Sequence, residues 1–143
     1  MTDNRTIIER FAQAIGANDT EAQDRLLADD IVETYPQSGE IIRGKANRRG
    51  IIENYPGGTP RETSEVGSSA PAFEITGAGD QFTAVSQITY PNGETWRYIG
   101  LIQVRDGKIA RITSYFAAPF EAPAWRAPYV EKVPRRHDRV DVR

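Results

Sequence analysis

Two side chains in the first third of the chain could carry out acid–base chemistry together, the carboxylate of Glu33 and the phenol of Tyr35. Residues 31–35 have the composition of a strand, and alternation along a strand places positions 33 and 35 on the same face. A carboxylate withdrawn from water serves as a general acid or base, and a phenol can hydrogen-bond a carbonyl or enolate oxygen. A structural interpretation also stays open, in which Glu33 is exposed at a strand edge or pairs with an arginine such as Arg43.

The composition excludes several other kinds of site. The chain has 143 residues, no cysteine and a single histidine, His137, which lies in the tail. Without cysteine the chain has no disulfide, thiolate nucleophile, zinc–thiolate site or iron–sulfur cluster. The pair Asp29-Asp30 could suggest a metal site, but its position after a helix end favours turn or capping bonds. We therefore expect no metal site and no cofactor.

Charge and hydropathy bear on possible partners. The chain carries 18 basic and 20 acidic residues, a net charge of −2, which gives no electrostatic footprint for nucleic acid. No segment approaches the roughly 20 apolar residues of a membrane span. The N-terminus also lacks the basic region and apolar stretch of a secretory signal. These features predict a single-domain cytoplasmic protein that binds neither nucleic acid nor membrane.

The elements that must position Glu33 and Tyr35 begin with a helical hairpin. Apolar residues recur at helical spacing near the N-terminus, and Thr20 with Gln23 forms a capping-box pattern at the start of a second helix. Two adjacent arginines, Arg48 and Arg49, read as solvated or salt-bridged surface of a third helix. The expected elements are helices at 3–15 and from 20, strands at 31–35 and 40–43, a helix at 45–55 and a loop at 56–71.

The second half of the chain predicts an antiparallel meander from about 72 to 116. The dipeptides Asn92-Gly93 and Asp106-Gly107 are strong signals for two-residue hairpin turns, because both central positions of such turns need positive φ. With a two-residue turn at Asn92-Gly93, Gln87 faces Tyr98 and Thr89 faces Trp96. The expected strands are 73–76, 81–90, 94–105 and 108–116.

Residues 119–143 form a proline-rich C-terminal arm. Four of the nine prolines fall in 119–134, which excludes a regular helix or a central strand. Three large aromatic side chains within the arm indicate that it packs on something, either its own domain or a partner subunit. Residues 132–143 carry a net charge of +3 against −5 for the rest of the chain, which suits a subunit contact better than nucleic acid.

Three stretches carry a resemblance to a known family. They are residues 27–33 (LADDIVE), Ile42-Arg43-Gly44 before the third helix, and residues 106–109 (DGKI) leading to Tyr115-Phe116. With the order of elements over residues 5–118, these stretches make the chain resemble the SnoaL-like group of the nuclear transport factor 2-like superfamily. The resemblance implies an α+β domain at 1–118, in which three N-terminal helices pack on a strongly curved antiparallel sheet that forms a conical cavity.

The family's geometry implies which side chains enter that cavity. Glu33 and Tyr35 become the candidate catalytic residues of an apolar pocket. The opposite sheet face is then expected to hold Ile88, Ile99 and Leu101, an apolar patch that predicts a homodimer. The candidate substrate-binding residues are Phe11, Tyr55, Gln87, Trp96, Tyr98, Ser114 and Phe116.

The catalytic residues of known family members do not carry over to this chain. Where ketosteroid isomerase has its Asp base before a proline, this chain has Tyr35-Pro36, and Ser114 stands where the epoxide hydrolases of this fold have an acid. The resemblance therefore implies an apolar small-molecule ligand but leaves the activity open. One hypothesis is a cofactor-free isomerase, cyclase or dehydratase acting on an apolar carbonyl compound. The alternative is a non-catalytic ligand-binding or dimeric scaffold module of the same fold.

Overall fold

The computed structural model describes residues 2–63 and 73–133. Helices α1 (Asn4–Gly16) and α2 (Thr20–Leu26) form the expected hairpin. Each helix begins at an aspartate: an Asp3 carboxylate oxygen accepts the Thr6 N–H at 2.8 Å, and one of Asp19 accepts the Ala22 N–H at 3.0 Å. The capping box expected at Thr20 was therefore wrong, because Asp19 provides the cap and Thr20 is already the first helical residue.

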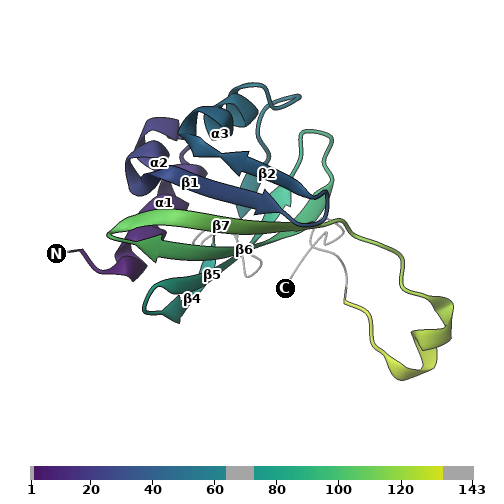
Figure 1. Cartoon of the computed structure of the whole chain (residues 1–143). Coiled ribbons are helices and arrows are strands. Elements are labelled where there is room, and N and C mark those ends of the chain that lie inside the picture. The colour runs from purple at the N-terminus through teal and green to yellow at the C-terminus, as the bar shows by residue number, and fades with distance from the viewer. Residues whose placement is uncertain (1, 64–72, 134–143) are drawn as a thin grey trace.

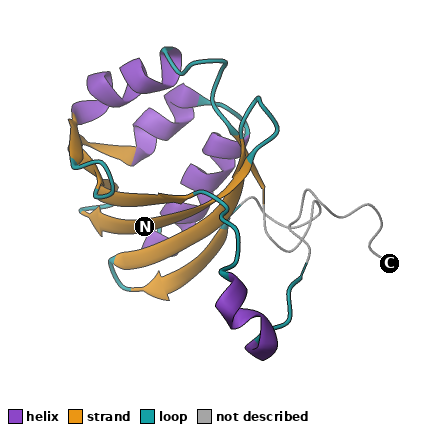
Figure 2. Cartoon of the chain, turned by 90° about the vertical axis from the view of Figure 1, so that its right-hand side faces the viewer, coloured by secondary structure: helices purple, strands orange, loops and turns teal. Residues whose placement is uncertain are grey.

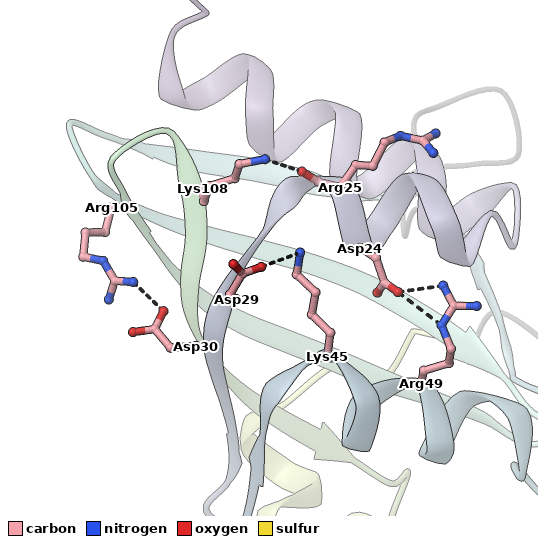
Figure 3. A network of polar contacts seen from close by, with 8 residues as sticks. All are labelled: Asp24, Arg25, Asp29, Asp30, Lys45, Arg49, Arg105 and Lys108. Carbon is pink, nitrogen blue, oxygen red and sulfur yellow. Dashed lines mark hydrogen bonds and ion pairs between the residues drawn. The ribbon is translucent and has the colours of Figure 1, made fainter.

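The chain passes from α2 directly into β1 (Leu27–Tyr35), turns into β2 (Glu40–Arg43), and continues in α3 (Gly44–Glu53). Strand β1 starts four residues earlier than expected, so Asp29 and Asp30 lie on a strand rather than in a turn or cap. Asp29 pairs with Lys45 of α3 at 3.3 Å, and Asp30 pairs with Arg105. Figure 3 shows how such pairs tie the surfaces of α2, α3 and β1 to one another.

Seven strands of the described residues form one sheet in the order β2-β1-β7-β6-β5-β3, with β4 paired to β5 as well. The expected strands of the second half are present as β4 (Glu74–Ala78), β5 (Gln81–Thr89), β6 (Thr95–Arg105) and β7 (Lys108–Ala117). Two expectations were wrong. The sheet is not wholly antiparallel, because β1 runs parallel to β7. The segment at 56–71 is not all loop, because β3 (Arg61–Thr63) pairs with β5.

The β5–β6 hairpin has a different turn from the expected one. Thr89 pairs with Thr95, and the Tyr90 N–H donates to the Glu94 carbonyl at 2.9 Å, which leaves a three-residue loop. The Gly93 N–H donates to the Tyr90 carbonyl and Gly93 has φ +89°, so a four-residue turn ends on a left-handed residue. The register is therefore shifted by one residue from the expected pairing.

The helices α1, α2 and α3 lie on one face of the curved sheet (Figures 1 and 2). The core forms between α1 and that face. Ile8 of α1, Ile31 of β1 and Ile109 of β7 are almost fully buried. Ile88 is buried on this inner face, so its expected position in the outer patch was wrong. Ile99 and Leu101 of that expected patch are exposed.

Beyond β7 the chain leaves the sheet as an arm that carries a short 3-10 helix, η1 (Ala124–Tyr129). Figure 2 shows η1 lying apart from the sheet and the helices. Phe120, Trp125 and Tyr129 are all at least 73% exposed, so these aromatic side chains do not pack closely on their own domain. The expected contact with a partner subunit stays a prediction, and the basic tail beyond residue 133, with His137, lies outside the described residues.

Candidate active site

A cavity of about 550 Å³ opens between α1, α3 and the inner face of the sheet. Alternation along each strand sends every second side chain toward it, from Glu33 and Tyr35 on β1 to Trp96 and Tyr98 on β6. The helix α3 has no buried residue, because its inward side chains face this open space instead of a packed core. Ile51 and Ile52 of α3, and Tyr55 just after the helix, line the cavity.

Most of the candidate residues meet at this cavity. Glu33 and Tyr35 line it together, as their spacing predicts. Five of the seven candidate substrate-binding residues also line it: Phe11, Tyr55, Trp96, Tyr98 and Phe116. Ser114 is fully buried behind the wall, where it contacts Glu33 rather than the open space.

Gln87 does not line the cavity, and its expected position was wrong. The three-residue loop pairs Ser86 with Tyr98, and Gln87 with Arg97. A shift of one residue in register exchanges the two faces of a strand. The inward side chain near this point of β5 is Ile88, and Gln87 is buried on the opposite face.

Glu33 is a buried carboxylate with a partner at each oxygen. The Ser114 hydroxyl donates to Oε2 at 2.8 Å, and Nε of Arg48 lies 3.6 Å from Oε1. Burial raises the pKa of the Glu33 carboxyl above its usual value of 4.5, and the Arg48 charge and the Ser114 hydrogen bond only partly oppose this effect. The site therefore holds a carboxyl group whose affinity for a proton is increased, as a general base requires.

The polar chain continues from Ser114 to a phenol in the cavity wall. The hydroxyl groups of Tyr98 and Ser114 are 2.8 Å apart. Gly100 makes this contact possible, because a Cβ at that position would collide with the Tyr98 hydroxyl. The Ser114 proton is donated to Glu33 when that carboxylate is ionised, so Tyr98 must then donate to Ser114. When Glu33 is protonated, the direction of both hydrogen bonds can reverse.

Arg48 is a charged cavity residue that the sequence interpretation missed. It lines the cavity with its side chain only 12% exposed, whereas Arg49 pairs with Asp24 at the surface as expected. The partner of Glu33 is Arg48 and not Arg43, because Arg43 is exposed at the end of β2. The available signal was helical spacing, since Ile51 and Ile52 of α3 line the cavity three and four residues after Arg48 and so share its face.

Tyr35 and the remaining aromatic side chains complete the wall. Tyr35 packs edge-on against Phe116, with ring centroids 5.2 Å apart. Burial, and secondly the Glu33 charge, raise the pKa of the Tyr35 phenol, so this group stays protonated and can donate a hydrogen bond. Tyr90 stacks with Tyr55 and meets Trp96 edge-on at 5.2 Å, which extends the apolar surface away from Glu33.

Comparison with known proteins agrees with this architecture. The sequence pattern of the SnoaL-like domain matches residues 8–112. The chain belongs to the SnoaL-like family. This match confirms the resemblance found in the sequence and the α+β fold expected from it. A comparison with curated proteins gave no match to the chain.

Several solved structures share the fold of this SnoaL-like protein. An NTF-2 like protein of unknown function from Burkholderia xenovorans LB400 is 30% identical, with a TM-score of 0.70 over 91% of this chain and 94% of that one. A candidate ketosteroid isomerase from Kribbella flavida is 24% identical, with a TM-score of 0.77 over 94% and 93%. A candidate polyketide cyclase from Pseudomonas putida is 22% identical, with a TM-score of 0.61 over 76% and 87%. In the described part of the SnoaL-like chain, no helix is long and apolar enough to cross a membrane.

Proposed function

We propose that this protein is a cofactor-free acid–base enzyme, an isomerase, cyclase or dehydratase that acts on an apolar carbonyl compound. The observation that carries the proposal is the buried carboxylate of Glu33 at the wall of an otherwise largely apolar cavity. A volume of about 550 Å³ suits a small organic molecule. Structural neighbours that are candidate isomerases and cyclases are consistent with such chemistry on this fold.

In the proposed reaction, Glu33 and Tyr35 act on the carbonyl group and the adjacent carbon. The Glu33 carboxylate takes a proton from the carbon next to the carbonyl, and the electron pair of that C–H bond moves to the carbonyl oxygen as an enolate. The Tyr35 phenol donates a hydrogen bond to this oxygen. The proton then returns from Glu33 to a different carbon, while Ser114 holds the carboxylate in place and acts as a positioning residue.

The proposal is tested with a simple ketone rather than the unidentified substrate. Cyclohex-3-en-1-one gains an ultraviolet absorbance when its double bond moves into conjugation, and its α-protons exchange with D2O when a base removes them. We expect the wild-type protein to accelerate both processes and Glu33→Gln to abolish the acceleration without loss of folding. Glu53→Gln is the matched control, because Glu53 lies on the exposed surface of α3. Activity retained in Glu33→Gln contradicts the mechanism.

A non-catalytic binding module is the second candidate function. It is favoured by the fact that both Glu33 oxygens already have partners within the protein, as in a structural ion pair. This candidate predicts ligand binding without exchange or isomerisation by the wild-type protein. The same ketone assay therefore separates the two functions.

We further propose that the protein is a cytoplasmic homodimer joined through the outer sheet face. Ile99 and Leu101 are 40% and 43% exposed there, which supports an apolar contact surface. Light scattering after size exclusion is expected to give twice the mass of the chain, and Leu101→Asp to give a monomer. A wild-type monomer at micromolar concentration contradicts the dimer and supports the scaffold alternative, in which the sheet face binds a different protein.

A further inference from the structure

The guanidinium group of Arg48 has hydrogen-bonding capacity that the described protein residues do not use. Its Nε and Nη1 atoms are buried and have no hydrogen-bond acceptor among those residues. The nearest carboxylate oxygen, Oε1 of Glu33, is 3.6 Å from Nε, which is longer than a hydrogen bond. Buried N–H groups without an acceptor are rare in proteins and cost about 1–3 kcal/mol each.

The surroundings of Arg48 also leave its charge incompletely balanced. The guanidinium lies over the Phe11 ring, 5.3 Å from the centroid, and borders the same cavity as Glu33. Burial favours the uncharged form of Glu33, so this carboxyl group is a poor permanent counter-ion. The titratable groups that line the cavity in the described chain are Glu33, Tyr35, Glu40, Arg48, Tyr55, Tyr90 and Tyr98.

We infer that the cavity binds an apolar compound that carries one anionic oxygen group, a carboxylate or an enolate, and that Arg48 is the specificity-determining residue that binds this group. An anionic oxygen supplies both the missing acceptor and the missing counter-charge, whereas a neutral carbonyl oxygen supplies only the acceptor. The inference rests on the cavity of the proposed function and refines its substrate class. It concerns binding alone and does not require turnover.

Two pairs of matched probes distinguish the two possible sources of the anionic oxygen. Adamantane-1-carboxylate is compared with adamantane-1-carboxamide, which has a similar shape and no charge. The enolate of 5,5-dimethylcyclohexane-1,3-dione is compared with its neutral methyl enol ether. Binding is measured by fluorescence of Trp96, which lines the cavity, in a Trp125→Phe background that removes the exposed tryptophan of the arm.

We expect the Trp125→Phe protein, with Arg48 intact, to bind at least one anion about tenfold or more tightly than its neutral partner. One charge-assisted hydrogen bond predicts a preference of this size. The pair that shows the preference identifies the oxygen group. Arg48→Met is expected to lose the preference, and Arg49→Met to keep it, because Arg49 pairs with Asp24 outside the cavity. Should Arg48→Met not fold, Arg48→Lys is used, which keeps the charge but lacks the guanidinium donors and is expected to weaken the preference.

The inference is overturned if neither anion binds more tightly than its neutral partner. It is also overturned if the preference persists without the Arg48 guanidinium, or if Arg49→Met removes it equally. Glu33→Gln separates this inference from the proposed enzyme activity. That variant is expected to lose proton transfer but to bind the preferred anion at least as tightly as before, because the Arg48 guanidinium is retained and the substituted side chain carries no charge.

Discussion

The Ser114 hydroxyl offers a direct test of the charge state of Glu33, through the variant Ser114→Ala. Ser114 is fully buried and donates to Oε2 of Glu33 at 2.8 Å. A hydrogen bond to an ionised group contributes about 1.5–3 kcal/mol to stability, and one between neutral groups about 0.5–1.5 kcal/mol. The cost of Ser114→Ala must therefore depend on whether Glu33 is ionised.

The pH at which this dependence appears follows from the direction of the pKa shift. Burial raises the pKa of Glu33 in the folded protein above 4.5, so the carboxyl is protonated near pH 4.5 and ionises as the pH rises above the folded value. The free energy of unfolding lost in Ser114→Ala is expected to be about 1–2 kcal/mol larger at a pH above the folded pKa of Glu33 than at pH 4.5. Without Ser114 the pKa of Glu33 rises further, since a group that stabilises the charged form has been removed.

Guanidinium chloride unfolding of wild type, Ser114→Ala, Glu33→Gln and the double variant measures this coupling as a double-mutant cycle. Ser86→Ala is the matched control, since Ser86 is equally buried on β5, which β6 separates from β7, and its hydroxyl has no partner among the described residues. We expect Ser86→Ala to cost little at any pH. A Ser114→Ala cost that is the same at both pH values and in the Glu33→Gln background refutes the hydrogen bond to an ionised carboxylate.

Close packing and burial give three further predictions. Gly100→Ala places a methyl group against the Tyr98 hydroxyl and is expected to lower the free energy of unfolding by about 1–3 kcal/mol, as measured by chemical unfolding. An unchanged free energy of unfolding means that Tyr98 does not lie over the glycine. Gly77 has φ +131° and lies against the backbone of β5, whereas Gly39 also has a positive φ but has open space around it. Gly77→Ala is therefore expected to lower the free energy of unfolding clearly more than Gly39→Ala, and equal losses contradict the packing. The folded state binds more protons at Glu33 than the unfolded state, so wild-type stability falls as the pH rises above 4.5, by at most about 1.4 kcal/mol per unit. Glu33→Gln lacks this decline, and an unchanged pH dependence in urea unfolding excludes the raised pKa.

The two hairpins of the second half show how far turn signals determine a fold. At Asp106-Gly107 both residues have positive φ, and Arg105 pairs with Lys108, so the expected two-residue turn is confirmed. At Asn92-Gly93 the same signal predicted the hairpin but not its register. Pro91 lacks the N–H needed to pair with Glu94 and suits the second position of a type I turn, so the ladder closes at Tyr90 instead.

The candidate site was predictable as far as local spacing determines it. Glu33 and Tyr35 share a face because they are two residues apart on a strand. Arg48 and Arg49 are adjacent and chemically identical, yet one lines the cavity and the other pairs with Asp24 at the surface. Successive side chains on a helix point about 100° apart, so the rotation of α3 over the sheet decides which of the two arginines faces the cavity. That rotation is set by tertiary packing, which the sequence of α3 does not contain.

The number of acids in the cavity constrains any reaction that occurs there. Two carboxylates border it among the described residues: Glu33 is buried, whereas Glu40 is exposed and accepts a hydrogen bond from Ser38. A mechanism with separate buried acid and base carboxylates therefore has no second group here. If Glu33 is the acid–base group, it must receive the proton and return it on the same side of the substrate, or pass it through Ser114 to Tyr98. Both routes favour transfer of a single proton over short distances, which is the chemistry of an isomerisation or a dehydration more than of a hydrolysis.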